Sequence, residues 1–125
     1  MGMVFQKVKV RGDKGSLDVN ALFDTGASKS LIRRDVAKRI GTLLRSGKPW
    51  IFQLGDGKGR LQTREMMGIY FLLKGVPIVQ TFIVSPSLSE EMIIGMDLMQ
   101  FWKIRPDPVK EDILIDKRLI QLKLV

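Results

Sequence analysis

The side chains of this chain that could do acid–base chemistry are chiefly carboxylates, and one of them stands out by its position. The 125 residues contain no cysteine and no histidine. This composition excludes thiol nucleophiles, Ser-His-Asp triads and thiolate zinc sites. Asp24, in the segment Asp24-Thr25-Gly26, directly follows the apolar run Ala21-Leu22-Phe23. A carboxylate at the end of an apolar strand costs free energy unless it is hydrogen-bonded or used chemically, so Asp24 is a candidate catalytic group.

The residues after Asp24 favour a tight turn. Gly26 lets the backbone turn sharply and approach a ligand closely. The hydroxyl of Thr25 can hydrogen-bond to neighbouring main chain and stiffen the turn. The simpler interpretation is a strand followed by an Asx-type turn and a helix, and the tripeptide alone does not decide between the two.

The elements that must position Asp24 are mostly strands. Apolar and polar residues alternate, or apolar residues cluster, between turn-forming glycines and prolines. These patterns predict strands over residues 4–10, 17–23, 50–54, 69–73, 76–84 and 92–94, with residues from Arg60 onward as the returning arm of a hairpin after Trp50–Leu54.

Two short helices and a closing hairpin complete the predicted elements. Ile32, Val36 and Ile40 are four residues apart, which predicts a helix from Ser30 or Arg33 to Ile40. Asp97 to Lys103 predicts one or two helical turns that end before the prolines. Residues 109–116 and 119–125 are predicted to form a hairpin, and the whole chain an all-β closed barrel or sandwich.

Three segments, in the right order, resemble the aspartic proteases, particularly the single-domain retropepsin-like group. The stretch Ala21 to Ser28 is similar to the active-site segment of that family. Ile93-Ile94-Gly95 matches its second signature, an apolar pair followed by glycine. Gly55-Asp56-Gly57-Lys58-Gly59 lies where the family has a glycine-rich flap that covers the substrate. The resemblance extends over roughly Val4 to Val125.

The resemblance implies one domain over residues 1–125, a retropepsin-like β-barrel with a pseudo-twofold strand–loop–strand active site. The chain has one Asp-Thr-Gly, whereas two-domain aspartic proteases carry two such motifs. A symmetric homodimer would bring Asp24 of each chain to the two-fold axis. The two carboxylates would then share one proton and activate a water to cleave a peptide bond, an arrangement that is one of the best-known examples of paired carboxylates. The resemblance implies no metal and no cofactor.

Other site residues follow from the same resemblance. Thr25 is expected to bond across the dimer axis, and Gly26 and Ala27 to complete the active-site loop. The flap is expected to close over a polypeptide substrate bound as an extended strand. Leu22 and Ile93 match positions that line side-chain pockets in the family, although both could equally belong to the core.

Some residues depart from the family pattern. Ala27 lacks the hydroxyl that many pepsin-like enzymes have, which predicts activity at less acidic pH. Ser28 and Lys29 replace an acidic pair that is common in retroviral enzymes, and Met96 replaces a basic residue. The ion pair between those two segments is therefore absent, and Asp97 is expected to bond to nearby backbone instead.

The bulk composition leaves alternatives open. A formal net charge of +8 is compatible with a basic β-barrel that binds nucleic acid. However, aromatic residues make up only 7% and do not alternate with Lys and Arg, which argues against nucleic-acid binding. We therefore expect the protein to require no nucleic acid as a partner. A second alternative is a catalytically weak dimerisation or peptide-binding module. No apolar run is long enough for a membrane span, and we expect a cytoplasmic protein or a domain released from a larger polypeptide. Leu119–Val125 could form a dimer strand or complete the core.

Overall fold

The computed structural model describes residues 3–53, 59–116 and 118. The chain begins with β1 (Met3–Arg11) and β2 (Ser16–Asp24), which pair antiparallel along their whole length. Val4, Val8 and Val10 point inward and are buried, as the alternation predicts. Met3 lies opposite Asp24 in the ladder, so the start of β1 runs beside the end of β2.

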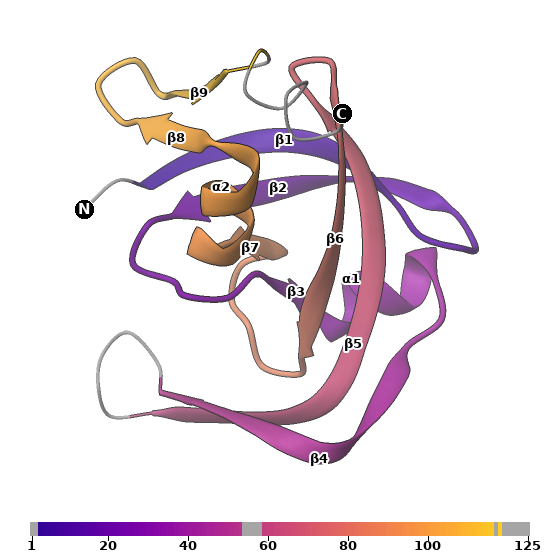
Figure 1. The fold of residues 1–125 in the computed structure, drawn as a ribbon. Helices are drawn as coiled ribbons and strands as arrows, with labels where there is room; N and C mark the ends of the chain where they lie inside the picture. The colour runs from indigo at the N-terminus through magenta and orange to yellow at the C-terminus, as the bar shows by residue number, and fades with distance from the viewer. Residues whose placement is uncertain (1–2, 54–58, 117, 119–125) are drawn as a thin grey trace.

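Six strands of the described chain close into a barrel (Figure 1). Beyond β2, the order is β7 (Met92–Ile94), β3 (Leu31–Arg33), β6 (Val76–Ser85) and β5 (Arg60–Leu73). β5 pairs back with β1 through Val10 opposite Phe71 and Arg11 opposite Tyr70, which completes the ring. The predicted all-β closed barrel is confirmed.

β7 lies between β2 and β3, parallel to the first and antiparallel to the second. The chain thus leaves the barrel along β2, turns through residues 25–30 and returns along β3. Because parallel strands end at the same edge of a sheet, Asp24 at the end of β2 and Gly95 just after β7 emerge side by side. This topology joins two segments that are about seventy residues apart in the sequence.

Both predicted short helices are present. α1 (Arg34–Ile40) buries Val36, Ala37 and Ile40, and α2 (Met96–Trp102) buries Leu98, Met99 and Trp102. Each side-chain set packs into the barrel core, which accounts for the apolar spacing. Residues 30–33, which the sequence left as a possible start of the first helix, instead form the end of the active-site loop and β3.

The hairpin formed by β4 (Leu44–Gln53) and β5 extends from the barrel as a long curved arm (Figure 1). β5 is one continuous strand of 14 residues, where the sequence suggested a returning arm followed by a separate strand at 69–73. Its first half pairs with β4 and its second half with β6, so one strand serves both the arm and the barrel.

The predicted hairpin of residues 109–116 with 119–125 is not tested, because residues 119–125 lie outside the described residues. β8 (Ile104–Asp107) pairs with β9 (Asp112–Ile115) in a separate two-stranded sheet. Pro106 was expected to end the second helix, and α2 does end before it, at Trp102. Among the described residues β8 pairs only with β9, so Pro106 lies in an edge strand, where a residue without an N–H is tolerated. Residues 119–125 lie outside the described chain, so neither proposed role for Leu119–Val125 is tested.

The core is apolar throughout the barrel. Phe23, Phe71 and Phe82 are fully buried, and the rings of Phe71 and Phe82 meet edge to face with centroids 6.5 Å apart. No helix in the described part of the chain is long and apolar enough to cross a membrane.

Candidate active site

Asp24 begins a tight turn at the end of β2. Its Oδ1 accepts a hydrogen bond from the Gly26 N–H at 2.8 Å, and its backbone carbonyl accepts one from the Ala27 N–H at 3.1 Å. These two bonds fix the carboxylate relative to the loop, and the side chain is half-buried rather than enclosed. Thr25 is half-buried beside it. Among the described residues, no donor reaches Asp24 Oδ2, so that oxygen can receive an external ligand.

The second glycine signature packs directly on this loop. The Met96 N–H donates to the Ala27 carbonyl at 2.8 Å. A Cβ built on Gly95 would lie 2.6 Å from the Lys29 carbonyl oxygen and 2.8 Å from that of Ala27. Only glycine fits such a close backbone approach. The backbone conformation does not require glycine, because any residue can adopt the φ of Gly95, −102°. The need for glycine here is therefore steric.

Ser30 and Asp97 hold the two segments together below the turn. The Ser30 hydroxyl donates to Asp97 Oδ1 at 2.8 Å and accepts the Gly95 N–H at 3.0 Å. The Ser30 N–H donates to Asp97 Oδ2 at 3.2 Å, and the Leu98 N–H donates to Oδ1 at 2.8 Å. The expectation that Asp97 bonds to nearby backbone is confirmed. The role of Ser30 was missed, although a small polar residue ahead of an apolar strand was a usable signal.

Leu22 and Ile93, the predicted pocket residues, are neighbours across the parallel β2–β7 ladder. Leu22 is buried and Ile93 is half-buried, and Ile93 also faces Leu31 of β3. The three side chains form one row across the sheet next to the active-site loop. This places the two residues together, and their role as a substrate pocket stays a prediction.

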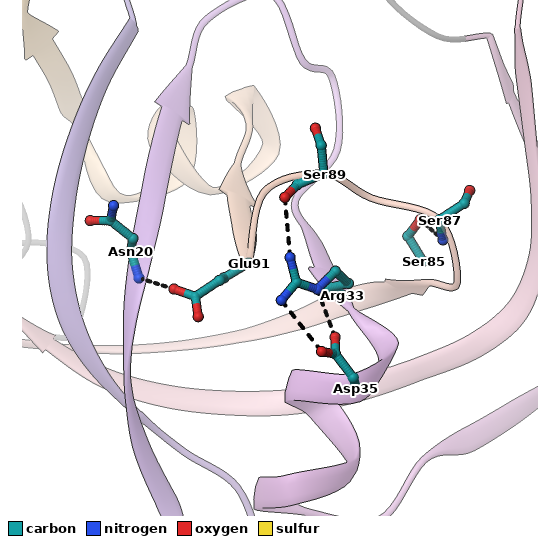
Figure 2. A network of polar contacts seen from close by, with 7 residues as sticks. All are labelled: Asn20, Arg33, Asp35, Ser85, Ser87, Ser89 and Glu91. Atoms are coloured by element: carbon teal, nitrogen blue, oxygen red, sulfur yellow. Dashed lines mark hydrogen bonds and ion pairs between the residues drawn. The ribbon is translucent and has the colours of Figure 1, made fainter.

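The loop between β6 and β7 is fastened to the barrel by one arginine (Figure 2). Arg33 donates from Nη1 to the Ser89 carbonyl at 3.1 Å and from its backbone N–H to the Glu91 carbonyl at 3.0 Å. Its Nε bonds to Asp35 at 2.7 Å, and this bond lowers the pKa of the Asp35 carboxyl. The Glu91 carboxylate in turn accepts the Asn20 N–H at 2.8 Å. The loop that leads into Ile93 is thus tied to both β2 and β3.

The predicted flap falls largely outside the described chain. Gly55, Asp56, Gly57 and Lys58 are not among the described residues, and Gly59 is half-buried at the start of the returning arm. The arms on either side do pair, with Gln53 opposite Arg60. A hairpin therefore exists at the predicted place, and its action as a flap stays a prediction.

A groove of about 980 Å³ lies between α2 and the β8–β9 sheet. Its apolar lining comes from Met96, Met99, Ile104, Leu114 and Ile115. Met96, whose N–H donates to Ala27 of the active-site loop, is also one of the lining residues of the groove. Within the described ranges, no group of three or more acidic residues is arranged to hold a metal ion.

Comparisons with known proteins agree with this geometry. The sequence profile of the family described as "gag-polyprotein putative aspartyl protease" matches residues 8–100. The fold is similar to the retroviral protease-like domain of Ddi1 from Leishmania major, with a TM-score of 0.67 and 22% identity over 93% of this chain and 90% of that one. It is also similar to EIAV protease complexed with the inhibitor HBY-793, with a TM-score of 0.53 and 20% identity over 78% of this chain and 86% of that one. No curated protein matches the sequence.

Proposed function

Because the chain belongs to the family of gag-polyprotein aspartyl proteases, we propose that it is a homodimeric aspartic endopeptidase with one Asp24 from each chain at its centre. The observation that carries the proposal is the loop itself. The Gly26 N–H holds Asp24 through Oδ1. The loop also packs closely on Gly95 and is fixed by the hydrogen bond between Ser30 and Asp97. Such a rigid support is what a catalytic carboxylate requires.

The reaction needs two carboxylates in different protonation states. In the proposed dimer, the ionised Asp24 accepts a proton from a bound water as the water oxygen attacks the carbonyl carbon of the peptide bond. The protonated Asp24 of the second chain hydrogen-bonds to the carbonyl oxygen and stabilises its developing charge. A proton then passes to the amide nitrogen, the C–N bond breaks, and the amine and the acid leave. One carboxylate cannot supply a base and an acid at the same moment, which is why the proposal requires two chains.

The substrate is proposed to bind as an extended strand beneath the β4–β5 hairpin. Extended peptides bind through their backbone, while alternate side chains enter pockets. Leu22 and Ile93 are apolar and adjacent, which favours hydrophobic side chains next to the cleaved bond. The fastened loop of residues 85–91 would form the neighbouring wall.

The surface beside the loop supports a contact with a second chain. Met3 and Phe5, next to Asp24 in the β1–β2 hairpin, are 49% and 54% exposed. Met96, whose N–H donates to that loop, also lines the apolar groove between α2 and the β8–β9 sheet. A partner copy on these surfaces would bury exposed apolar area and bring its own loop toward the first.

Cleavage by the wild-type chain and by Asp24→Asn tests the catalytic part of the proposal. Digestion of a peptide library over a range of pH is expected to show hydrophobic residues around the cut, and Asp24→Asn is expected to abolish cleavage while leaving the unfolding midpoint within a few degrees of wild type. Asp18→Asn, on the exposed face of β2, is the matched control and should cleave normally. Cleavage that persists in Asp24→Asn would refute the mechanism.

Sedimentation at micromolar concentration tests the dimer. Leu114→Arg places a charge in the apolar groove, at a side chain that is 45% exposed and so not needed for the core. We expect it to shift the chain toward monomer and to lower activity in proportion. Val109→Arg, on the adjacent turn at 93% exposure, is the control and should stay dimeric. A wild-type chain that is strictly monomeric and inactive would favour a peptide-binding module instead.

A further inference from the structure

The outer face of the β5–β6 hairpin carries a group of exposed apolar side chains. Tyr70 lies opposite Val79 in the antiparallel ladder, and Leu72 lies opposite Pro77. Residues that are directly opposite in such a ladder point to the same face, and so do residues two apart along one strand. Leu72 is 57% and Val79 65% exposed, and Tyr70 and Pro77 are exposed as well. We call these four residues the outer-wall patch.

Gly68 lies beside the patch, and neither sterics nor backbone conformation requires a glycine there. It is exposed, two residues before Tyr70 on the same face of β5, and opposite Thr81. The ladder runs through it without a bulge, and among the described glycines only Gly75 has a positive φ. A Cβ added to Gly68 would meet no atom within 4 Å. Glycine inside a strand weakens it, and one reason to have it is the close approach of another chain.

Basic side chains flank the patch on one side. β1 pairs with β5 here, and Arg11 lies directly opposite Tyr70. Lys9 and Lys7 precede Arg11 on the same outward face of β1, and all three are exposed. Asp18 of β2 faces Lys9, and the ion pairs found within the described residues involve none of the three cations. Three cations and one carboxylate leave this flank with a net charge of +2.

The chemistry of the patch and its flank decides which partner fits. A second copy docked through the same patch would offer the basic flank no counter-charge. Nucleic acid supplies phosphates, but its bases stack on aromatic rings and have little to gain from Leu72 and Val79. These arguments leave an acidic partner that also carries apolar side chains.

The partner must dock through side chains rather than as an added strand. At Tyr70 and Phe71, β5 already pairs with β6 on one side and with β1 on the other, so its backbone cannot take a further strand there (Figure 1). A helix is about 10 Å across, which is close to the width of two neighbouring strands. A helix that runs along β5 and β6 therefore covers the patch and keeps one of its flanks beside β1.

We propose that the outer-wall patch docks an amphipathic helix of a partner protein, with acidic residues on the flank that faces Arg11. The apolar stripe of the helix lies on Tyr70, Leu72 and Val79, and one of its side chains occupies the bare strand at Gly68. The net positive charge of the flank attracts the acidic residues and sets the orientation of the helix. The site does not depend on the chemistry at Asp24.

Fluorescence anisotropy with a designed peptide tests the proposal, in the full chain carrying Asp24→Asn so that the probe is not cleaved. The probe is a helical peptide of about 18 residues with leucines spaced three and four apart and glutamates along one flank. Its counterpart has lysines in place of the glutamates. The glutamate peptide is expected to bind at least about tenfold more tightly, with the difference shrinking at high salt. Equal binding of the two peptides would overturn the proposal.

Substitutions in the patch locate the binding. Leu72→Glu puts a charge under the apolar stripe and Gly68→Tyr fills the bare position, and each is expected to weaken binding of the glutamate peptide about tenfold. Ile51→Glu is the matched control, since Ile51 of the β4–β5 arm is 60% exposed, and it should change the affinity less than about twofold. Val79→Glu replaces Leu72→Glu if that variant does not fold. Unchanged binding in both patch variants, or equal loss in Ile51→Glu, would contradict the assignment.

Vesicles distinguish a protein partner from a lipid surface. Vesicles of phosphatidylcholine and phosphatidylserine are expected to bind the wild-type chain and Leu72→Glu alike, because the proposed occupant is a helix and not a membrane. If the vesicles bind and Leu72→Glu abolishes that binding, while the glutamate peptide does not bind, the patch is a lipid-binding surface and the proposal is wrong.

Discussion

The hydroxyl of Ser30 donates to Asp97 across 2.8 Å while accepting the N–H of Gly95, and this pair joins the active-site loop to the second glycine signature. Ser30 is fully buried, and its hydroxyl oxygen satisfies one donor and one acceptor at once. Ser28, Lys29 and Met96, which lie nearby, cannot form the ion pair that is expected between the same segments in retroviral enzymes. Here the hydrogen bond from the Ser30 hydroxyl to the Asp97 carboxylate holds the loop instead.

Ser30→Ala is expected to lower the free energy of unfolding by about 1–3 kcal/mol, because it leaves the buried Gly95 N–H without its acceptor and removes one of the two hydrogen bonds to Asp97 Oδ1. The measurement is the urea midpoint. Ser28→Ala, two residues away and exposed, is the control, and its effect should stay within about 0.5 kcal/mol. Equal midpoints for the two variants would mean that the Ser30–Asp97 contact contributes nothing to stability.

Gly95→Ala is expected to displace the active-site loop, because the added methyl would overlap the carbonyls of Ala27 and Lys29. Overpacking of this kind costs about 1–3 kcal/mol, and any cleavage activity should fall with it. Gly68→Ala is the matched control, since nothing lies within 4 Å of its added Cβ on β5. Thermal unfolding of both variants checks the prediction, which fails if Gly95→Ala unfolds at the wild-type temperature.

Asp13 gives the stability of the chain a defined pH dependence. Its Oδ2 accepts the Thr42 hydroxyl and its Oδ1 the Thr42 N–H, each at 2.7 Å, and these bonds lower the pKa of Asp13 below its ordinary value of 3.8. Because the folded chain binds this proton less tightly than the unfolded chain, the stabilisation is complete above the ordinary pKa. It is lost as the pH falls through the lowered value of the folded state.

We therefore expect Asp13→Asn to be less stable than wild type at pH 7, with the difference shrinking as the pH falls below 4. Urea denaturation at pH 7, 5, 4 and 3 measures the difference directly. Asp18→Asn controls for the loss of one surface charge, because Asp18 is exposed and no donor found among the described residues bonds to its carboxylate. A gap between Asp13→Asn and wild type that widens toward acid pH would contradict the assignment.

Local pattern explains why most of the barrel was predictable. Alternation in residues 4–10 and 17–23 fixes which side chains face inward, and burial of Val8, Val10 and Val19 follows from it. Partner choice is what the local pattern does not specify. Residues 112–115 have the pattern of a strand, but nothing local says that they pair with residues 104–107. Pairing depends on the position of α2 and the barrel wall, which fix where β8 begins.

The sequence by itself determined the chemistry that is available: no thiol, no imidazole, and one aspartate placed at the end of an apolar strand before a glycine. It also determined the strand and helix types, because these depend on residue periodicity. Only the tertiary structure decided that β7 enters between β2 and β3 and that Ser30 meets Asp97. The same holds for the irregular stretch of the β4–β5 ladder, beside which Arg34, Arg45 and Arg64 line one hollow. Such contacts depend on which distant segments become neighbours in space, and the spacing of residues along the chain does not specify those neighbours.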